Sequence, residues 1–307
     1  MITSFGYLVA GTILLYLGAD WVVKSGVYVA RKFRIQPLII GLTIVAFGTS
    51  LPELVVSLDA AFKDHSPIAI GNVIGSNIAN VGLVLGLSAF IFPITIRFSA
   101  IKRNIFIYLF VCVVFVLFLM DNYIARWEGG LLFIGIIVYT WSCVKHPPGP
   151  VQAEPEQFKS LAMALLVLLG GIFFLYFGAE LFIKGAMAMA MLLGVNEVVI
   201  GMSVVAFGTS LPELATSLVA AFKKESAISI GNIIGSNLFN ILSVIGLVAL
   251  IKPLGCPHKI MNLEVPFMIG FGLVLIPLSL VKQPIPRWAS SILVLGYILF
   301  IWLLFNR

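Results

Sequence analysis

The chain has 307 residues, of which 61% are hydrophobic and 10% are charged. Its mean hydropathy of +1.12 lies far above what the core of a soluble domain requires. The composition therefore excludes a soluble globular protein and predicts a polytopic membrane protein. The formal net charge of +6 does not indicate nucleic-acid binding, because the basic residues cluster between the apolar runs, as the positive-inside rule describes for membrane proteins.

Ten apolar runs follow one another along the chain, each about as long as a helix that crosses the ~30 Å of membrane hydrocarbon. They are expected at 5–30, 37–62, 69–95, 104–120, 127–143, 161–190, 197–222, 228–252, 262–281 and 287–305. The first run is not expected to be a cleaved signal peptide, because it lacks a basic N-terminal region and because residues 16–20 match residues 176–180 in the second half.

The distribution of Lys and Arg predicts the orientation in the membrane. A short, proline-rich linker at 144–160 joins the two halves of the chain. The loops on the linker's side hold Arg31, Lys32, Arg34, Arg97, Lys102, Arg103, Lys145, Lys159, Lys223, Lys224, Lys282 and Arg287, and those on the other side hold Lys63, Arg126, Lys252, Lys259 and Arg307. We therefore expect a plasma-membrane protein with a cytoplasmic linker and with both termini outside the cell.

The chain contains an internal duplication. Residues 41–53, GLTIVAFGTSLPE, recur as residues 201–213, GMSVVAFGTSLPE, and this offset of 160 positions holds without a gap from Leu15 to Leu87. About 30 of the 47 positions from 41 to 87 are identical to their counterparts. The copies lie in the second and seventh spans, so five crossings separate them and they enter the membrane from opposite faces. The predicted fold is an all-α integral membrane protein with ten helices in two inverted-topology repeats of five, 1–143 and 161–307.

Each copy of this motif places a proline and a glutamate at membrane depth. Pro52 lacks an N–H and its ring displaces the carbonyl of Gly48, so we expect the helix to break there and to free main-chain oxygens. Thr49 and Ser50 precede Glu53 by about one helical turn and share its face. Burying a carboxylate in a membrane is costly, which favours ion binding over a structural hydrogen bond. Such hard oxygen donors suit Ca²⁺ or Na⁺ and argue against zinc or copper. The second copy supplies Gly208, Thr209, Ser210, Pro212 and Glu213.

The third and eighth spans carry a second repeated motif, GNVIGSNIAN at 71–80 and GNIIGSNLFN at 231–240. Ser76 and Asn80 are one helical turn apart, as are Ser236 and Asn240, so each pair can add neutral oxygen ligands opposite the glutamates. The alternative for these four residues is hydrogen bonding between helices. For Asn77 and Asn237, both roles, ion ligand and hydrogen bonding between helices, remain open. Four glycines are interpreted as positions of close helix packing, Gly71, Gly75, Gly231 and Gly235.

The remaining polar residues within or beside the spans have simpler interpretations. Asp20 and Glu180 are each followed four residues later by a lysine, Lys24 and Lys184, and are expected to form surface ion pairs. All three histidines lie in predicted loops, so an intramembrane hydrolase would lack a base other than the glutamates. The three cysteines are scattered and predict small apolar filler, not a disulfide framework.

The two motifs, each present twice in a chain of ten predicted spans, resemble those of the cation/calcium exchanger superfamily, and most closely its prokaryotic sodium/calcium exchanger branch. The resemblance implies that Glu53 and Glu213 bind Ca²⁺ centrally and contribute to flanking Na⁺ sites. It further implies ligands from hydroxyl groups and main-chain carbonyls at Thr49, Thr209, Ser50, Ser210, Ser76, Ser236, Ala46 and Ala206. It also implies that residues 7–30 and 161–190 slide past a fixed core. Many members carry an aspartate at one of the positions held here by Asn80 and Asn240.

The leading functional hypothesis is a secondary antiporter, not an enzyme, that drives Ca²⁺ out of the cell against Na⁺ entry by alternating access. Its substrates would be Ca²⁺ and Na⁺ and its surroundings the lipid bilayer, with no cofactor, nucleic acid or obligatory protein partner. One alternative is exchange of another cation pair, H⁺ for Ca²⁺ or a K⁺-dependent exchange. A passive cation channel is disfavoured, because an inverted repeat builds two half-sites within one chain and suits alternating access.

Overall fold

The computed structural model of the chain describes residues 2–95, 97–145, 158–193, 206–281 and 284–306. Nearly all of them are helical. The helical segments are α1 (Ile2–Lys32), α2 (Pro37–Ile40), η1 (Gly41–Val45), α3 (Ala46–Thr49), α4 (Leu51–Phe62), α5 (Ser66–Ala79), η2 (Asn80–Leu85), α6 (Gly86–Ile91), α7 (Phe98–Leu119), α8 (Arg126–Val144), α9 (Leu161–Leu192), α11 (Ala206–Gly208), α12 (Leu211–Phe222), α13 (Ser226–Phe239), η4 (Asn240–Ile245), α14 (Gly246–Ile251), η5 (His258–Asn262), α15 (Glu264–Leu280) and α16 (Arg287–Phe305).

Two short strands depart from the all-α expectation. β1 (Tyr123–Ile124) pairs antiparallel with β2 (Leu254–Gly255). The main-chain N–H of Cys256 extends this pairing by donating to the carbonyl of Asn122 at 2.8 Å. The strands join the loop between α7 and α8 to the loop after α14, so they fasten two connections together at one end of the helices.

The structure confirms a multi-pass helical membrane protein. Within the described residues, eight helical stretches are long and apolar enough to span a membrane, and the bent pair formed by residues 37–49 and 51–62 makes a ninth. The expected seventh span, 197–222, lies partly outside the described residues; its described end is α12, an apolar helix of 12 residues. The number of ten spans and their inverted arrangement therefore remain predictions.

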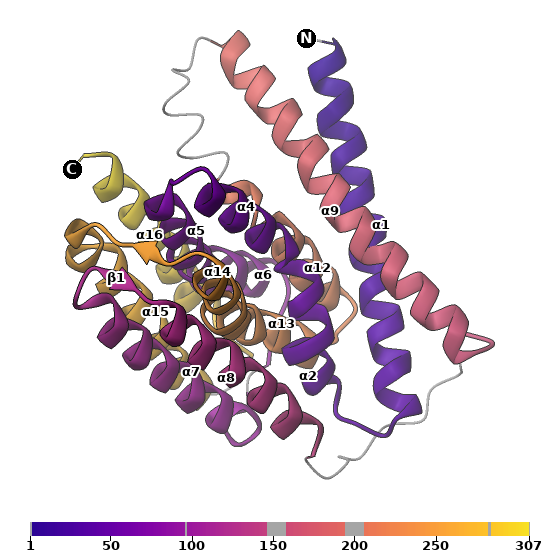
Figure 1. The fold of residues 1–307 in the computed structure, drawn as a ribbon. Helices are drawn as coiled ribbons and strands as arrows, with labels where there is room; N and C mark the ends of the chain where they lie inside the picture. The colour runs from indigo at the N-terminus through magenta and orange to yellow at the C-terminus, as the bar shows by residue number, and fades with distance from the viewer. Residues whose placement is uncertain (1, 96, 146–157, 194–205, 282–283, 307) are drawn as a thin grey trace.

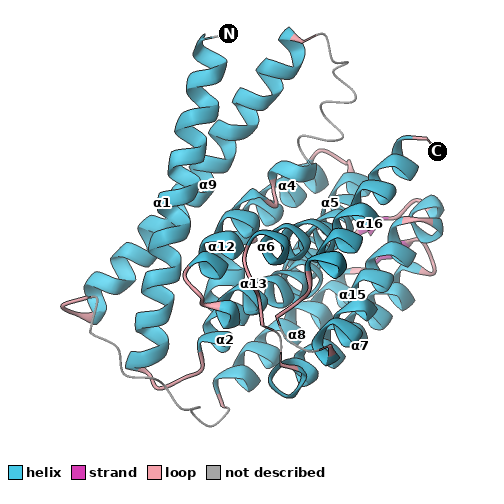
Figure 2. Cartoon of the chain, turned by 180° about the vertical axis from the view of Figure 1, so that it is seen from behind, coloured by secondary structure: helices cyan, strands magenta, loops and turns pink. Residues whose placement is uncertain are grey.

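Two layers are visible in the arrangement of the helices. The long helices α1 and α9 run in opposite directions and cross one another beside a compact bundle of the other helices (Figures 1 and 2). Glycine lets them approach closely, since a Cβ atom at Gly18 would lie 2.7 Å from the carbonyl oxygen of Gly171. The two helices share an apolar core with α12 and the first turn of α13, through residues such as Leu15, Val22, Leu175 and Ala220.

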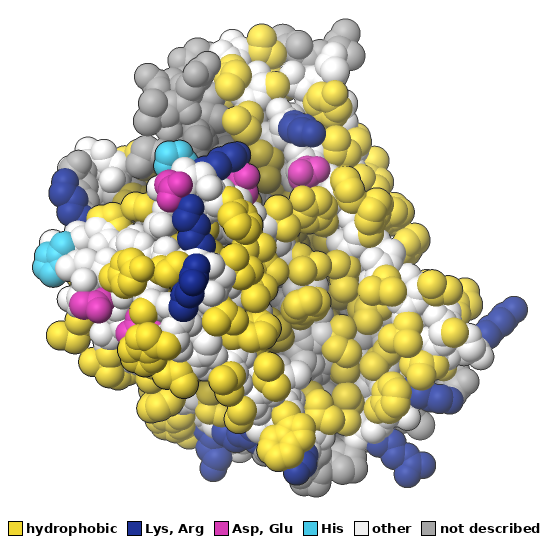
Figure 3. Space-filling model, in the orientation of Figure 1, with side chains coloured by type: hydrophobic (Ala, Val, Ile, Leu, Met, Phe, Trp, Pro, Cys, Tyr) yellow, Lys and Arg dark blue, Asp and Glu magenta, His cyan; other side chains and the backbone are white. Residues whose placement is uncertain are grey.

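The centre of the bundle consists of the two helices that carry the second repeated motif. The stretch from α13 to α14 is mostly buried, whereas α16 is mostly exposed. Large apolar side chains cover the outer surface of the peripheral helices, as on α8, which exposes Trp127, Leu131, Ile134, Ile137 and Trp141. Figure 3 shows this apolar surface, with Lys and Arg both along its lower edge and on its upper part, where Asp and Glu lie near them. Such a surface is expected where the outer helices face lipid.

The repeated motifs produce repeated local structure. The chain bends by 42° between α3 and α4, and Pro52 occupies the first turn of α4, where a missing N–H has no cost. Ser50 at this break has φ −84° and ψ 6°, and its counterpart Ser210 has φ −86° and ψ 4°. π-Helical segments also begin at both Asn80 and Asn240. Helices interrupted in this way occur preferentially at functional sites.

Packing at Gly231 leaves no space for a side chain. A Cβ atom there would lie 2.6 Å from the carbonyl oxygen of Leu38 and 2.9 Å from the Cα atom of Gly41, and neither main-chain atom can move easily. Gly235 is similarly crowded by Leu42. The predicted close packing is thus confirmed for the second copy of the motif. At Gly71 and Gly75 no described atom comes within 4 Å of an added Cβ, and the residues equivalent to α2 and η1 lie outside the described ranges.

We expect Gly231→Ala to lower the unfolding temperature of the purified protein, because overpacking against main chain costs about 1–3 kcal/mol. Gly270→Ala is the matched control, since no described atom lies within 4 Å of a Cβ atom added there. Replacing an uncrowded helical glycine should be neutral or slightly stabilising. Equal unfolding temperatures for the two variants would contradict the packing described for Gly231.

Candidate functional site

Glu53 and Glu213 are brought together in the middle of the bundle by the two broken helices. Each occupies the first turn of its helix, α4 or α12, where unpaired N–H groups favour negative charge. Both residues are 0% exposed, and Ser50, three residues before Glu53, donates to the Glu213 carboxylate. Two buried carboxylates therefore share one site.

Glu213 receives hydroxyl groups from both halves of the chain. Ser50, from the first half, and Ser236, from the second, each donate to its Oε1 atom at 3.3 Å. Its Oε2 atom is buried and has no hydrogen-bond partner among the described residues. The first motif thus supplies a donor to the glutamate of the second motif, an arrangement that sequence spacing within one helix could not predict.

Glu53 has a similar but looser setting. The hydroxyl groups facing it belong to Ser76 and Thr209, whose oxygens lie 3.4 Å apart. Neither carboxylate oxygen of Glu53 has a hydrogen-bond partner within the described part of the chain, and the same holds for the hydroxyl of Ser210. Several buried oxygens around this carboxylate therefore have lone pairs that no described donor uses.

Thr49 is the counterpart of Thr209 and lies at the equivalent position in the first repeat. Its Oγ1 atom is 3.3 Å from Oγ of Ser236, 3.1 Å from Oδ1 of Asn232 and 3.3 Å from the carbonyl oxygen of Ala46. Ala46 begins α3 and its carbonyl also accepts from the N–H of Ser50 at 3.0 Å. The equivalent alanine, Ala206, begins α11, and its side chain lies outside the described part of the structure.

Four buried asparagines form a second cluster between α5 and α13. The Asn80 amide donates to Oδ1 of Asn237 at 3.1 Å, and the Asn240 amide donates to Oδ1 of Asn77 at 3.1 Å. Asn77 also donates to the main-chain carbonyl of Asn237 at 3.2 Å. Asn77 and Asn237, which sequence analysis left open, therefore orient Asn80 and Asn240. The Oδ1 atoms of the latter two have no partner among the described residues.

Sequence analysis missed two further asparagines. Asn72 donates to the main-chain carbonyl of Glu53 at 3.2 Å and to Oγ of Ser57 at 3.0 Å, and it accepts from Thr209 at 3.4 Å. Asn232 makes the same three contacts in the other half of the chain. The available signal was spacing, since Asn72 lies one helical turn before Ser76 and shares its face.

The surroundings of the two long helices differ between the two halves. A cavity of about 240 Å³ between α9 and α4 is lined by Val56, Ala179, Ile183 and Glu180, among others, and it reaches Thr209. At the equivalent place α1 packs on α12. There the counterparts of the first three residues, Thr216, Ala19 and Val23, are 0% exposed.

The ion pairs of α1 and α9 also differ between the two halves of the chain. Asp20 on α1 pairs with Lys24, as predicted, at 2.7 Å, and also with Lys223 at the end of α12 at 2.5 Å. Its counterpart Glu180 forms no ion pair with any residue that the structure describes, so the pair predicted with Lys184 is not formed. The lysine equivalent to Lys223 is Lys63, which pairs with Asp59 on its own helix at 2.8 Å.

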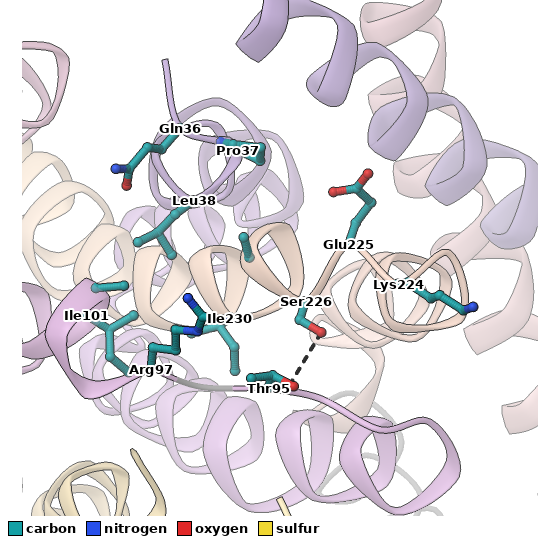
Figure 4. A pocket seen from close by; sticks show the side chains of 12 residues that line it. Gln36, Pro37, Leu38, Thr95, Arg97, Ile101, Lys224, Glu225, Ser226 and Ile230 are labelled. Atoms are coloured by element: carbon teal, nitrogen blue, oxygen red, sulfur yellow. Dashed lines mark hydrogen bonds between the residues drawn. The ribbon is translucent and has the colours of Figure 1, made fainter. Parts of the chain in front are cut away.

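A second cavity, of about 480 Å³, lies away from the glutamates at the N-terminal ends of α2 and α13 (Figure 4). Arg97 extends across it toward Ile230, and the N–H of Thr95 donates to Oγ of Ser226 at 3.4 Å. None of the residues predicted to bind ions lines this cavity. It is therefore separate from the candidate site.

Comparison with known proteins identifies the family. A family model described as sodium/calcium exchanger protein matches residues 3–145 and 163–306. The sodium/calcium exchanger MaX1 of Methanosarcina acetivorans is 33% identical over 99% of both chains, and the inner membrane protein YrbG of Escherichia coli is 34% identical over 99% of this chain and 96% of its own length. A solved structure of the sodium-calcium exchanger NCX_Mj matches with a TM-score of 0.86 and 36% identity, covering 98% of each chain. The duplicated chain, with its paired glutamates, belongs to the sodium/calcium exchanger family.

Proposed function

We propose that this protein is a secondary antiporter that exchanges Na⁺ for Ca²⁺ by alternating access. The observation that carries the proposal is the pair of fully buried glutamates, Glu53 and Glu213, set by two broken helices among oxygens that no described donor satisfies. Hydroxyl, amide and carboxylate oxygens are the ligands that Ca²⁺ and Na⁺ prefer. The proposed ligands are Glu53, Glu213, Thr49, Thr209, Ser50, Ser210, Ser76, Ser236, Asn80, Asn240, Ala46 and Ala206.

The charge of the site suits these ions. Two ionised glutamates supply two negative charges, which one Ca²⁺ or two Na⁺ would balance. Asn80 and Asn240 are neutral, so a third Na⁺ in the same place would leave an uncompensated buried positive charge, which is costly. The competing ions would thus replace each other at similar net charge.

The named relatives support this assignment. MaX1 is named a sodium/calcium exchanger. The NCX_Mj structures, soaked with Na⁺ and Ca²⁺ or with Na⁺ and Sr²⁺, concern extracellular ion exchange and induced binding-site occlusion in that protein. The equivalent chemistry in this chain, which matches those structures along nearly its whole length, would be exchange of the same ions.

Alternating access is supported by the unequal surroundings of α1 and α9. We propose ten spans in two inverted repeats, 1–143 and 161–307, joined by the linker at 144–160. A sequence repeat with opposite orientations can adopt two conformations in which the halves exchange roles. In the structure described here α1 is closed on α12, while a cavity beside α9 reaches Thr209. The opposite state would close α9 on α4 and open a cavity beside α1.

The positions of the basic residues indicate the side of the membrane to which the cavity beside α9 opens. Lys223, beside the closed contact, lies in a loop on the linker's side, which the positive-inside rule assigns to the cytoplasm. The cavity beside α9 would then give access from outside the cell, with the chain in the plasma membrane and both termini external. The runner-up function is exchange of H⁺ for Ca²⁺, which uses the same two carboxylates and differs in the ion that drives the cycle.

We expect Glu53→Gln and Glu213→Gln each to abolish Na⁺-driven Ca²⁺ transport in proteoliposomes while leaving a folded protein. Each removes one of two buried charges, which at an effective dielectric constant of ~20 weakens Ca²⁺ binding by on the order of 100-fold or more. Asp59→Asn is the matched control, because it removes an exposed carboxylate from the same helix as Glu53. Wild-type uptake at low Ca²⁺ by either glutamine variant would refute the site. Uptake driven by a proton gradient without Na⁺ would favour the runner-up.

We expect acid to weaken Ca²⁺ binding. Protons and Ca²⁺ compete for the same two carboxylates, which cannot both stay ionised beside each other without a cation. Calcium affinity of the purified protein should therefore fall between about pH 8 and about pH 5.5. The double variant His65→Gln and His258→Gln should behave in the same way, since both histidines lie outside the site. An unchanged affinity over this range would show that the two carboxylates do not act on one ion.

We expect cysteines introduced at positions 56 and 216 to differ in accessibility, because they lie on opposite sides of the proposed site. With an impermeant thiol reagent, Val56→Cys should react readily and Thr216→Cys slowly, because the former lines the cavity and the latter is buried. Asp20→Asn removes the ion pair with Lys223 and should speed labelling at position 216 while slowing it at position 56. The three native cysteines are buried and give little background. Labelling that changes in the same direction at both positions would contradict alternating access.

A further inference from the structure

We propose that Asn232 and Asn72 are positioning residues that point the hydroxyl protons of Thr49 and Thr209 away from the transported cation. A threonine hydroxyl binds a cation only through an oxygen lone pair, so its proton must be accepted by another group. The two amides are placed to accept it. The inference rests on the proposed function and assigns a role to residues outside its ligand set.

The orientation of the Asn232 amide is fixed by its neighbours. Its Nδ2 atom lies 3.4 Å from the main-chain oxygen of Glu213 and 3.2 Å from Oγ of Ser217. A carbonyl oxygen can only accept a hydrogen bond, so the NH₂ group must face Glu213. The Oδ1 atom is thereby turned toward Thr49, at 3.1 Å, where it can only accept.

The Thr49 hydroxyl has one proton; three oxygens lie within hydrogen-bond distance of it, and it also faces the Glu213 carboxylate. Asn232 Oδ1 is the nearest acceptor, at 3.1 Å; the carbonyl of Ala46 and the hydroxyl of Ser236 are both at 3.3 Å. A buried amide oxygen without a donor would be costly, whereas the Ala46 carbonyl already accepts from the N–H of Ser50. The proton of Thr49 therefore belongs to Asn232.

The proton of Ser236 is also directed elsewhere, because its hydroxyl donates to Oε1 of Glu213 at 3.3 Å. The oxygens of Thr49 and Ser236 then face each other with lone pairs, 3.3 Å apart. Two bare lone pairs at this distance repel unless a cation lies beside them. Oxygens held about 2.4 Å from one Ca²⁺ at right angles are about 3.4 Å apart, which is close to the separation observed.

The other half of the chain repeats the contacts of the amide, although Ser76 forms no hydrogen bond with Glu53 there. Asn72 donates to the main-chain oxygen of Glu53 and to Oγ of Ser57, so its Oδ1 atom is turned toward Thr209, whose hydroxyl donates to it at 3.4 Å. The oxygens of Thr209 and Ser76 are 3.4 Å apart. The same geometry in two copies of the sequence argues against an accidental contact.

Each amide also connects the two halves. Asn232 holds the main chain at Glu213, in the second half, and the hydroxyl of Thr49, in the first. A carboxylate and a hydroxyl that bind one ion are thus kept in register although they come from different repeats. Groups that orient metal ligands in this way typically contribute 10- to 100-fold to metal affinity.

The test measures Ca²⁺ binding to the purified full-length protein by titration calorimetry. Asn232→Leu keeps the side-chain size and removes the acceptor, and we expect it to weaken Ca²⁺ binding by about 10- to 100-fold. Ser217→Ala is the matched control, because it removes the other side-chain partner of the same amide and leaves the acceptor of Thr49 in place. We expect its affinity to stay within about threefold of wild type.

A double-mutant cycle separates positioning from packing. In the background of Thr49→Val, which has no hydroxyl to orient, Asn232→Leu should cause no further loss of Ca²⁺ affinity. A residue that only stabilised the bundle would weaken binding equally in both backgrounds, and that result would overturn the proposal. Wild-type affinity in Asn232→Leu alone would overturn it as well.

Asn72 provides the second route if Asn232→Leu does not fold, because Asn72 is only partly buried and should tolerate leucine. The same cycle is then measured with Asn72→Leu and Thr209→Val, with Ser57→Ala as the control. Wild-type protein that binds no Ca²⁺ would refute the proposed function itself. Normal wild-type binding with additive losses in both cycles would refute only the role of the amides.

Discussion

The structure depends on one electrostatic constraint, the burial of two carboxylates at membrane depth. A pair of like charges in a low-dielectric interior is unstable without an opposite charge. Within the described ranges no lysine or arginine forms an ion pair with Glu53 or Glu213, and the side chains that face the two carboxylates carry hydroxyl groups. In the proposed function a mobile cation would supply the compensating charge, which a permanent structural ion pair would prevent.

The surrounding polar groups serve this constraint without adding charge. Serine and threonine hydroxyls provide oxygen, and asparagine amides both accept and donate, so they can fix each hydroxyl's direction while remaining neutral. Close packing of main chain, as at Gly231, keeps these groups in place. Buried polar networks that are incompletely satisfied are usually a defect. Here the described buried atoms without a partner include three of the four carboxylate oxygens of Glu53 and Glu213, which is expected if an ion completes the network.

Much of this organisation could be predicted from the sequence. The apolar runs gave the helices, because a membrane span has a fixed minimum length, and Pro52 correctly located the break beside Ser50. Local spacing failed where partners come from distant segments. The donation from Ser50 to Glu213 joins the two halves, and the role of Asn232 appears only when the main chain of one helix meets the side chain of another. The paired strands were too short to give a periodic pattern.

One difference between the repeats makes the ion pairs at the two long helices unequal. Lys63 and Lys223 are counterparts at the ends of α4 and α12, but the residue four positions earlier is Asp59 in one repeat and Val219 in the other. Lys63 can remain paired within its own helix, whereas the acid paired with Lys223 belongs to α1. In the proposed cycle, an acid on α9 would meet a lysine already paired within its own helix, whereas the acid on α1 meets a lysine whose helix carries Val219 in that place. Two repeats that share the same motifs would therefore hold their long helices with different ion pairs.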